Sequence, residues 1–306
     1  MERSVLVYDI GGSHVSAALC HEAGYRLGPV ISAPHPDQQS SAAFVGLLHT
    51  LGMEATADPG AAAGAELAMP GPFDYAAGVS WMQHKLPYLY GVDLRRALAS
   101  RFGWKPEQVG FLNDAAAYLL GEVGAGAAQG AGRAVGFTLG TGIGSAFSVD
   151  GRVVTEGPGV PPGGEIWNVP YEGGIVEDVV SGRAIVANYR KRAGVEREVA
   201  DLAAAAPCDP AAAEAFVEFG RNFGLALRKT LTAFAPQVVV LGGNISRSAH
   251  LFLPALRDAL DGLPLELKVA ALLDRAPLAG AGVAWFHQVA SLSAEGKAAG
   301  APASVV

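Results

Sequence analysis

The sequence has few of the residues that mark disulfide-rich, metal-bound or nucleic-acid-binding proteins. Its 306 residues include two cysteines, Cys20 and Cys208. Two cysteines so far apart in the sequence make neither a disulfide framework nor a CxxC metal site. Lysine and arginine total 22 against 29 aspartates and glutamates, so the net charge is −7. Without a basic stripe, we expect no binding to nucleic acid or to anionic lipid.

Long apolar runs are also missing. One run without Asp, Glu, Lys, Arg or His, residues 134–149, is rich in glycine and too short to span a membrane. The apolar run at the N-terminus reaches Asp9 after a few residues, which is too short for a signal peptide. We therefore expect a cytoplasmic protein of a reducing compartment, with no membrane partner.

What the sequence does contain is enough apolar material for large cores. Half of the residues are hydrophobic and 17% are charged, and the length suggests about two domains. We expect a smaller α/β domain at 1–112, with a helix near 280–292 as a candidate to complete it. A larger α/β domain is expected at 113–279, and a flexible tail at 293–306 because that stretch is small, polar and bears glycine and proline.

The pattern of strands and glycines indicates two related halves. Residues 4–10 and 15–20 predict consecutive strands joined by a glycine turn, which favours a meander over a strand–helix crossover. Residues 133–154 repeat the arrangement: strand, glycine turn, strand and an Asp-Gly hairpin. A long amphipathic helix is predicted at 211–235, where apolar residues recur at three- and four-residue intervals.

Three strands end in glycine turns, in the stretches DIGGSH, TLGTGIG and VLGGN. Such turns bring backbone N–H groups close to a phosphate, although each one alone also fits a structural turn. GTGIG at 140–144 resembles the beginning of a dinucleotide fingerprint, but that motif must open a helix. A strand and hairpin are predicted after it here, so we reject that alternative.

The ordered motifs resemble those of the ROK family (repressors, open reading frames, kinases). They run from about Val5 to Trp285, and they are DIGGSH, PGPFD, FLNDAAAYLLGE, TLGTGIG, PGGEI, VEDVVSG, VVVLGG and PLAGAG. The resemblance implies the two-domain actin-like ATPase (ribonuclease H-like) α/β fold, with a cleft between the domains for ATP and sugar. Because the first strand starts at once, with no helix-turn-helix before it, the chain looks like the kinases of the family rather than its repressors.

Phosphoryl transfer needs positioned donors and charge neutralisation, and the motifs supply candidates. Asp9 would hold Mg²⁺, through water, beside the phosphates of ATP. The resemblance implies that Asp114 is the general base. The expected sugar-binding residues, Asp114 among them, are Gly71, Asn113, Asp114, Glu165, Asn168 and Glu177. The expected nucleotide-binding residues, with Asp9, are Gly11, Gly12, Ser13, Gly140, Thr141, Gly142, Gly144, Gly242, Gly243 and Asn244.

Some of these residues have simpler interpretations, and some segments depart from the family. Asn113 or Asp114 would also serve as a helix N-cap. Asn168 stands where many members have a sugar-binding, zinc-ligating histidine, and the cysteines of the following loop are absent, so we predict no zinc site. Lys85 stands near a usual asparagine; it would contact an anionic substrate or simply lie on the surface.

We therefore predict an ATP- and Mg²⁺-dependent hexose kinase of the glucokinase kind, acting on the 6-hydroxyl of glucose or a related sugar. An N-acylhexosamine kinase is one alternative. A non-catalytic sugar-sensing protein that retains the fold is another. Because the family often forms dimers, we expect a homodimer.

Overall fold

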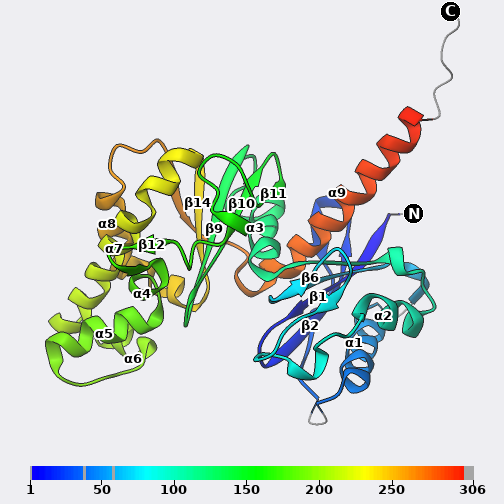
Figure 1. Cartoon of the computed structure of the whole chain (residues 1–306), viewed down its shortest axis with the longest axis horizontal. Coiled ribbons are helices and arrows are strands. Elements are labelled where there is room, and N and C mark those ends of the chain that lie inside the picture. Colours follow the sequence, from blue (N-terminus) through cyan, green and yellow to red (C-terminus); the bar gives the residue numbers. More distant parts are fainter. Residues whose placement is uncertain (1, 37–38, 57–58, 300–306) are drawn as a thin grey trace, which may run out of the picture. The chain divides into compact units, whose positions relative to one another are not determined.

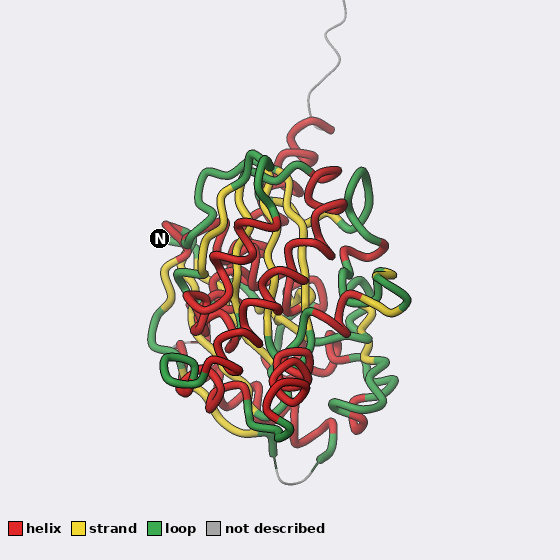
Figure 2. The backbone as a smooth tube through the Cα atoms, turned by 90° about the vertical axis from the view of Figure 1, so that its left-hand side faces the viewer, coloured by secondary structure: helices red, strands yellow, loops and turns green. Residues whose placement is uncertain are grey.

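The computed structural model describes residues 2–36, 39–56 and 59–299, and the chain divides into two compact units. Unit 1 comprises Met1–Ala125 and Arg275–Val306, and unit 2 comprises Gly126–Asp274. Each unit contains a sheet with helices packed against it (Figures 1 and 2). No helix in the described ranges is long and apolar enough to cross a membrane.

Unit 1 is built on a sheet of strand order β3-β2-β1-β5-β8, with β4 also paired to β2. Its strands are β1 (Ser4–Ile10), β2 (His14–His21), β3 (Arg26–Leu27), β4 (Ile31–Pro34), β5 (Ala65–Met69) and β8 (Val109–Asn113), beside a small hairpin of β6 (Phe73–Asp74) and β7 (Val79–Ser80). Strand β1 is antiparallel to β2, whereas β5 is parallel to both β1 and β8. The carboxyl ends of β1, β5 and β8 therefore share one edge of the sheet.

Helices cover both faces of this sheet. They are α1 (Ser41–Thr56), α2 (Leu94–Phe102), α3 (Asp114–Ala125) and α9 (Ala276–Ala299). Alternate residues of β1 face opposite ways: Leu6 and Tyr8 pack in a core with α1 and α2, and Val7 packs in a second core with α9 (Figure 1). A strand buried on both faces needs an unbroken apolar sequence, which explains the run at residues 5–8.

Unit 2 has a sheet of order β11-β10-β9-β14-β15. Its strands are β9 (Arg133–Leu139), β10 (Ile143–Val149), β11 (Arg152–Val154), β14 (Val238–Gly242) and β15 (Glu266–Val269), with a separate hairpin of β12 (Pro170–Tyr171) and β13 (Gly174–Ile175). Its helices are α4 (Val176–Val179), α5 (Gly182–Ala193), α6 (Val199–Ala205), α7 (Pro210–Phe234) and α8 (Ala249–Ala259). In Figure 2, helices lie over the strands of this unit.

The core of unit 2 forms where α7 packs on the sheet. The predicted apolar residues of α7 are all buried: Phe216, Phe219, Phe223, Leu227, Leu231 and Phe234. The ring of Phe223 meets Phe137 of β9 edge-on at a centroid distance of 5.5 Å, and Phe219 meets Phe252 of α8 in the same way at 5.2 Å. Edge-to-face aromatic pairs at these distances add to the stability gained from burial.

The two sheets share one topology, as the repeated strand–turn–strand pattern predicted. In each, a first strand pairs antiparallel with the second, and two later strands are added in parallel on its other side. The Asp-Gly hairpin is also present: Asp150 and Gly151 have φ values of 49° and 73°, as a type I′ turn requires. Strand β10 follows Gly142, where a dinucleotide-binding motif would need a helix, so the dinucleotide-binding alternative is excluded.

The units divide at different places from the expected domain boundaries. The sequence suggested a boundary at 112/113, but α3 belongs to unit 1. The reason is its contact with α9. A Cβ on Gly280 of α9 would overlap the backbone of Ala117 of α3, and a Cβ on Gly121 would overlap the backbone of Ala276. The second unit ends at Asp274 rather than 279, because Arg275 and α9 belong to unit 1.

The expectation of a flexible tail at 293–306 is wrong for its first residues, because α9 continues to Ala299. Residues 300–306 lie outside the described residues.

One acidic side chain lies in the interior of unit 1. Glu66 of β5 is 3% exposed, and its Oε2 atom has no hydrogen-bond partner among the residues that the structure describes. It lies against Gly110 of β8, where any Cβ would overlap the carboxyl group. Burial raises the pKa of Glu66 to about 8, although the charge of Arg95 acts in the opposite direction. The carboxyl group is therefore largely protonated at neutral pH.

Candidate active site

The first glycine turn joins β1 to β2 at the carboxyl edge of the unit 1 sheet. The Gly11 N–H donates to the carbonyl of His14 at 2.9 Å, and the carbonyl of Gly11 lies 2.8 Å from Nε2 of His35. Gly12 has neither a positive φ nor a neighbour within 4 Å of a Cβ placed on it. Neither backbone conformation nor packing therefore requires glycine at this position, whereas close approach of a ligand would.

Asp9 and Ser13 flank this turn. Asp9 is half-buried on β1, where it pairs with Ser16 of β2. The hydroxyl of Ser13 lies 2.9 Å from Nδ1 of His14. A carboxylate beside an exposed turn of backbone donors is a suitable environment for a hydrated Mg²⁺ held against phosphates.

The second glycine turn, between β9 and β10, is held by Glu177. A Cβ on Gly142 would overlap the Glu177 carboxylate, which accepts a hydrogen bond from the N–H of Ile143 at 3.2 Å. The other oxygen of Glu177 accepts from Arg183 at 2.6 Å. Sequence reasoning assigned Glu177 to the sugar and did not foresee this contact with the turn.

The remaining residues of the second turn differ in how open they are to solvent. Gly140 has no atom within 4 Å of a Cβ placed on it, and its carbonyl accepts from the N–H of Gly182 at 2.8 Å. Thr141 is exposed, and Gly144 pairs with Thr138 in the sheet.

The third turn follows β14 and has a packing reason for its glycine. Gly243 has a φ of 77°, and a Cβ there would overlap the backbone of Leu139. Gly242 ends β14 beside Thr138, and Asn244 begins a short 3-10 helix. Because β9 and β14 are parallel, this turn and the second one lie at the same edge of the unit 2 sheet. Ligands of α/β proteins commonly bind outside the carboxyl ends of parallel strands.

Asn113 and Asp114 stand where β8 passes into α3. The Oδ1 atom of Asn113 accepts from the N–H groups of Ala115 and Ala116, at 3.0 and 3.2 Å. Its amide nitrogen donates to the Tyr75 hydroxyl at 3.2 Å. Asn113 thus caps the helix, a task that the sequence left open between it and Asp114.

Asp114 has the environment of a proton acceptor. Burial raises its pKa, while the N–H of Ala115 and the charge of Lys85 lower it in part. A base with a pKa raised toward the working pH accepts a proton more readily than an ordinary aspartate. The carboxyl ends of β1, β5 and β8 bring three predicted groups to one edge of unit 1: the first turn, Gly71, and Asn113 with Asp114.

The segment around Glu165 is fixed by a residue that sequence reasoning missed. The hydroxyl of Ser145 on β10 donates to the carbonyl of Gly164 at 2.6 Å and accepts from the N–H of Ile166 at 2.9 Å. It therefore pins the chain on both sides of Glu165. A polar residue within the apolar run after TLGTGIG was the available signal.

Two side chains next to Glu165 point to solvent. Trp167 is 41% exposed, and its indole N–H donates to Oε2 of Glu165 at 3.1 Å. Asn168 is exposed, and its side chain makes no hydrogen bond within the described part of the chain. The loop expected to replace the zinc segment is a hairpin that turns at Glu172 and Gly173. The residues described include no group of three or more His, Cys, Asp or Glu placed to bind a metal.

Comparison with known proteins now identifies the family. A model of the ROK family matches residues 5–289. The chain belongs to the ROK family. It is similar to the ROK hexokinase of Thermus thermophilus, with 28% identity, a TM-score of 0.80, and coverage of 94% of this chain and 99% of that one. The predicted two-domain actin-like ATPase fold is confirmed.

Two further relatives carry named activities or ligands. A glucokinase of Thermotoga maritima is 30% identical over 62% of this chain and 66% of its own length. A ROK family glucokinase from Streptomyces griseus, solved with glucose and AMPPNP, has 23% identity, a TM-score of 0.71, and coverage of 91% of this chain and 98% of that one. The chain spans about half to two thirds of the length of the curated relatives that it matches.

Proposed function

We propose that this protein is an ATP-dependent sugar kinase that phosphorylates a hexose hydroxyl, with the 6-hydroxyl of glucose or a close relative as the leading candidate. The observation that carries the proposal is the buried environment of the Asp114 carboxyl group. Asn113 accepts from two N–H groups at the start of α3 and so caps it, Asp114 accepts from only one of them, and burial raises the pKa of the Asp114 carboxyl group. The named hexokinase and glucokinase relatives support the same reaction class.

In the proposed reaction, Asp114 accepts the proton of the sugar hydroxyl as that oxygen attacks the γ-phosphorus of ATP. General base catalysis of this kind contributes typically about 10²–10⁴-fold to the rate. Backbone N–H groups of the first two glycine turns hold phosphate oxygens. Asp9 would hold Mg²⁺ through water, and the metal ion would there supply neutralisation of phosphate charge. Every atom of the γ-phosphoryl group passes to the sugar, and ADP leaves.

Each unit, considered by itself, offers polar groups for sugar hydroxyls. Asn113, Glu165 and Asn168 offer amide and carboxylate groups for hydroxyls, and Glu177 retains acceptor capacity beyond its two existing bonds. Gly71 would admit the sugar close to the backbone. Such polar groups discriminate strongly between sugars because a missing hydroxyl leaves a partner unsatisfied.

The test is ADP release from ATP and Mg²⁺ with a panel of hexoses and N-acylhexosamines. We expect sugar-stimulated turnover, and loss of at least about 100-fold in Asp114→Asn with unchanged binding of AMPPNP. Asp74→Asn, a change at an exposed aspartate of the same unit, is the control and should keep full turnover. An Asp114→Asn protein with normal turnover removes Asp114 from the base role, and no turnover with any sugar refutes the kinase proposal.

Two observations favour alternatives worth testing in the same experiment. Asn168 replaces the histidine expected from the family resemblance, and the Glu177 carboxylate is already bound to Arg183 and Ile143. A sugar pocket altered in this way would suit an N-acylhexosamine, or a sensor that binds sugar without transferring phosphate. Turnover restricted to N-acylhexosamines supports the first alternative. Heat of sugar binding by calorimetry without ADP release supports the second.

A further inference from the structure

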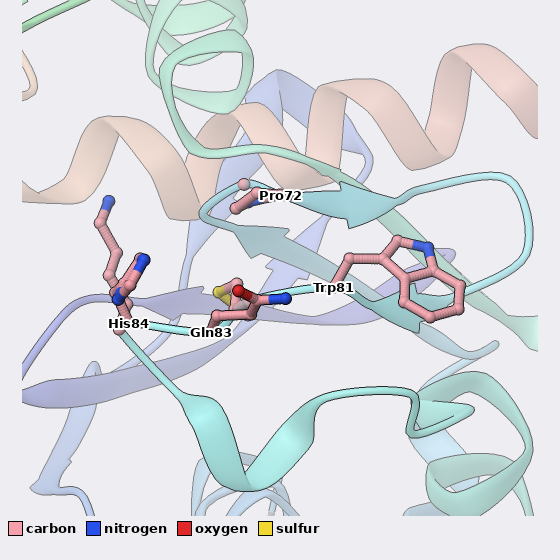
Figure 3. Close-up of a pocket in the computed structure, with 7 residues that line it drawn as sticks. Pro72, Trp81, Gln83 and His84 are labelled. Carbon is pink, nitrogen blue, oxygen red and sulfur yellow. The ribbon is translucent and has the colours of Figure 1, made fainter.

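A pocket in unit 1 has a lining suited to an anion. It has a volume of about 380 Å³ and is lined by Gly71, Pro72, Trp81, Met82, Gln83, His84 and Lys85. This volume lies at the lower end of the range typical of small-molecule sites. Figure 3 shows Gln83 between Trp81 and His84, with Pro72 across from them. The lining includes an amide, an imidazole and an ammonium group, but no carboxylate.

The polar side chains of this pocket are exposed to solvent. Gln83, His84 and Lys85 make no side-chain hydrogen bond or salt bridge with any residue that the structure describes. The ammonium group of Lys85 has no acid among the residues that line the pocket. Its donors are available to a ligand from solution.

The pocket adjoins the proposed catalytic residues. A Cβ placed on Gly71 would lie 3.7 Å from the hydroxyl of Tyr75. That hydroxyl accepts the hydrogen bond from Asn113 and donates to the carbonyl of Met69 at 3.1 Å. The charge of Lys85 also acts on Asp114, where it opposes the effect of burial. A group bound in the pocket would therefore lie beside the sugar that Asn113 and Asp114 are proposed to bind.

We propose that this pocket is a subsite for an anionic substituent of the acceptor sugar, held by the ammonium group of Lys85. The inference rests on the proposed function, because it assumes that the acceptor binds at Asn113 and Asp114. A carboxylate or a phosphate ester would accept from Lys85 and Gln83. The carbon chain that carries it would lie against the exposed indole of Trp81, which is 47% exposed. A neutral hexose leaves the charge of Lys85 unmatched.

The test compares the binding of sugars that differ in one anionic group and keep the 6-hydroxyl. N-acetylglucosamine is paired with N-acetylmuramic acid for a carboxylate, and glucose with glucose 1-phosphate for a phosphate ester. Calorimetry on the full chain measures each Kd. We expect the acid of at least one pair to bind roughly tenfold tighter than its neutral partner, as for a hydrogen bond to a charged group. The pair that shows the preference identifies the anion.

Substitutions assign the preference to Lys85. In Lys85→Met we expect the Kd ratio within the pair to fall to about one, in Lys85→Arg most of the preference to remain, and added salt to reduce the preference in the native chain. Lys105→Met, an exposed lysine of the same unit outside the pocket, controls for the change in net charge. The inference is overturned if neither pair shows a preference, or if the preference survives in Lys85→Met.

Two further outcomes separate this inference from the kinase proposal. If neutral hexoses are phosphorylated and neither acid binds more tightly than its neutral partner, the kinase proposal holds and the subsite is refuted. Acids whose binding depends on Lys85, with no ADP release from any sugar of the panel, support the subsite and refute the kinase proposal. Weakened AMPPNP binding in Lys85→Met, with equal binding of both sugars in each pair, assigns Lys85 to the phosphoryl donor and overturns the inference.

Discussion

Replacing the buried Glu66 with glutamine should remove a large pH dependence from the stability of unit 1. The pKa of this carboxyl group is about 8 in the folded protein, against 4.5 for an unperturbed glutamate. Between these values the folded state holds a proton that the unfolded state has lost. The free energy of unfolding therefore falls as pH rises, by about 1.4 kcal/mol per pH unit.

From pH 5.5 to 7.5 this group alone should cost the native protein about 2.7 kcal/mol. Glu66→Gln keeps the shape and does not titrate, so its melting temperature should fall less across that range. Over that range, the difference between the melting temperatures of the two proteins should change by roughly 5–10 °C. The assay is thermal unfolding of both proteins at several pH values, with Glu54→Gln, an exposed change on α1, as the control. If Glu66→Gln and the native protein lose the same stability, Glu66 is not protonated in the fold and the reasoning fails.

Three further predictions concern the site. Because Asp114 must be ionised to accept a proton and burial raises its pKa, kcat/KM should fall at acidic pH, and Lys85→Met should move that fall to higher pH in a pH–rate profile. Gly243→Ala should destabilise the fold by roughly 2–4 kcal/mol in urea unfolding. Gly12→Ala should change stability by less than about 0.5 kcal/mol and weaken AMPPNP binding. Equal losses of stability in the two variants would contradict the packing argument. Ser145→Ala should cost roughly 1–3 kcal/mol and raise the KM for sugar more than the KM for ATP.

The sequence predicted local elements well because their signals are local. The apolar run of β1, the helical spacing in α7 and the Asp-Gly turn each encode an element within a few residues. The repeat of strand–turn–strand segments also predicted the shared topology of the two sheets. The family resemblance added predictions that these signals do not contain: which turns face a nucleotide and which acid acts as base.

What could not be predicted depends on residues that meet only after folding. Nothing near Ser145 in the sequence shows that it bonds on both sides of Glu165. The contact of Glu177 with the second glycine turn joins residues 34 positions apart. The hydrogen bond from Asn113 to Tyr75 likewise depends on how β8 lies beside the chain after β5. Such contacts arise from tertiary packing, so the sequence around each residue does not predict them.

The close contact between α3 and α9 can form only late in the synthesis of the chain. Helix α3 carries Asp114 at its first position, yet the glycine contacts that seat it come from Ala276 and Gly280. The ribosome synthesises the whole of unit 2 between these two helices. Asp114 therefore acquires its final environment only after unit 2 has been translated, and a nascent chain that stops before α9 carries the proposed base without the helix that seats it.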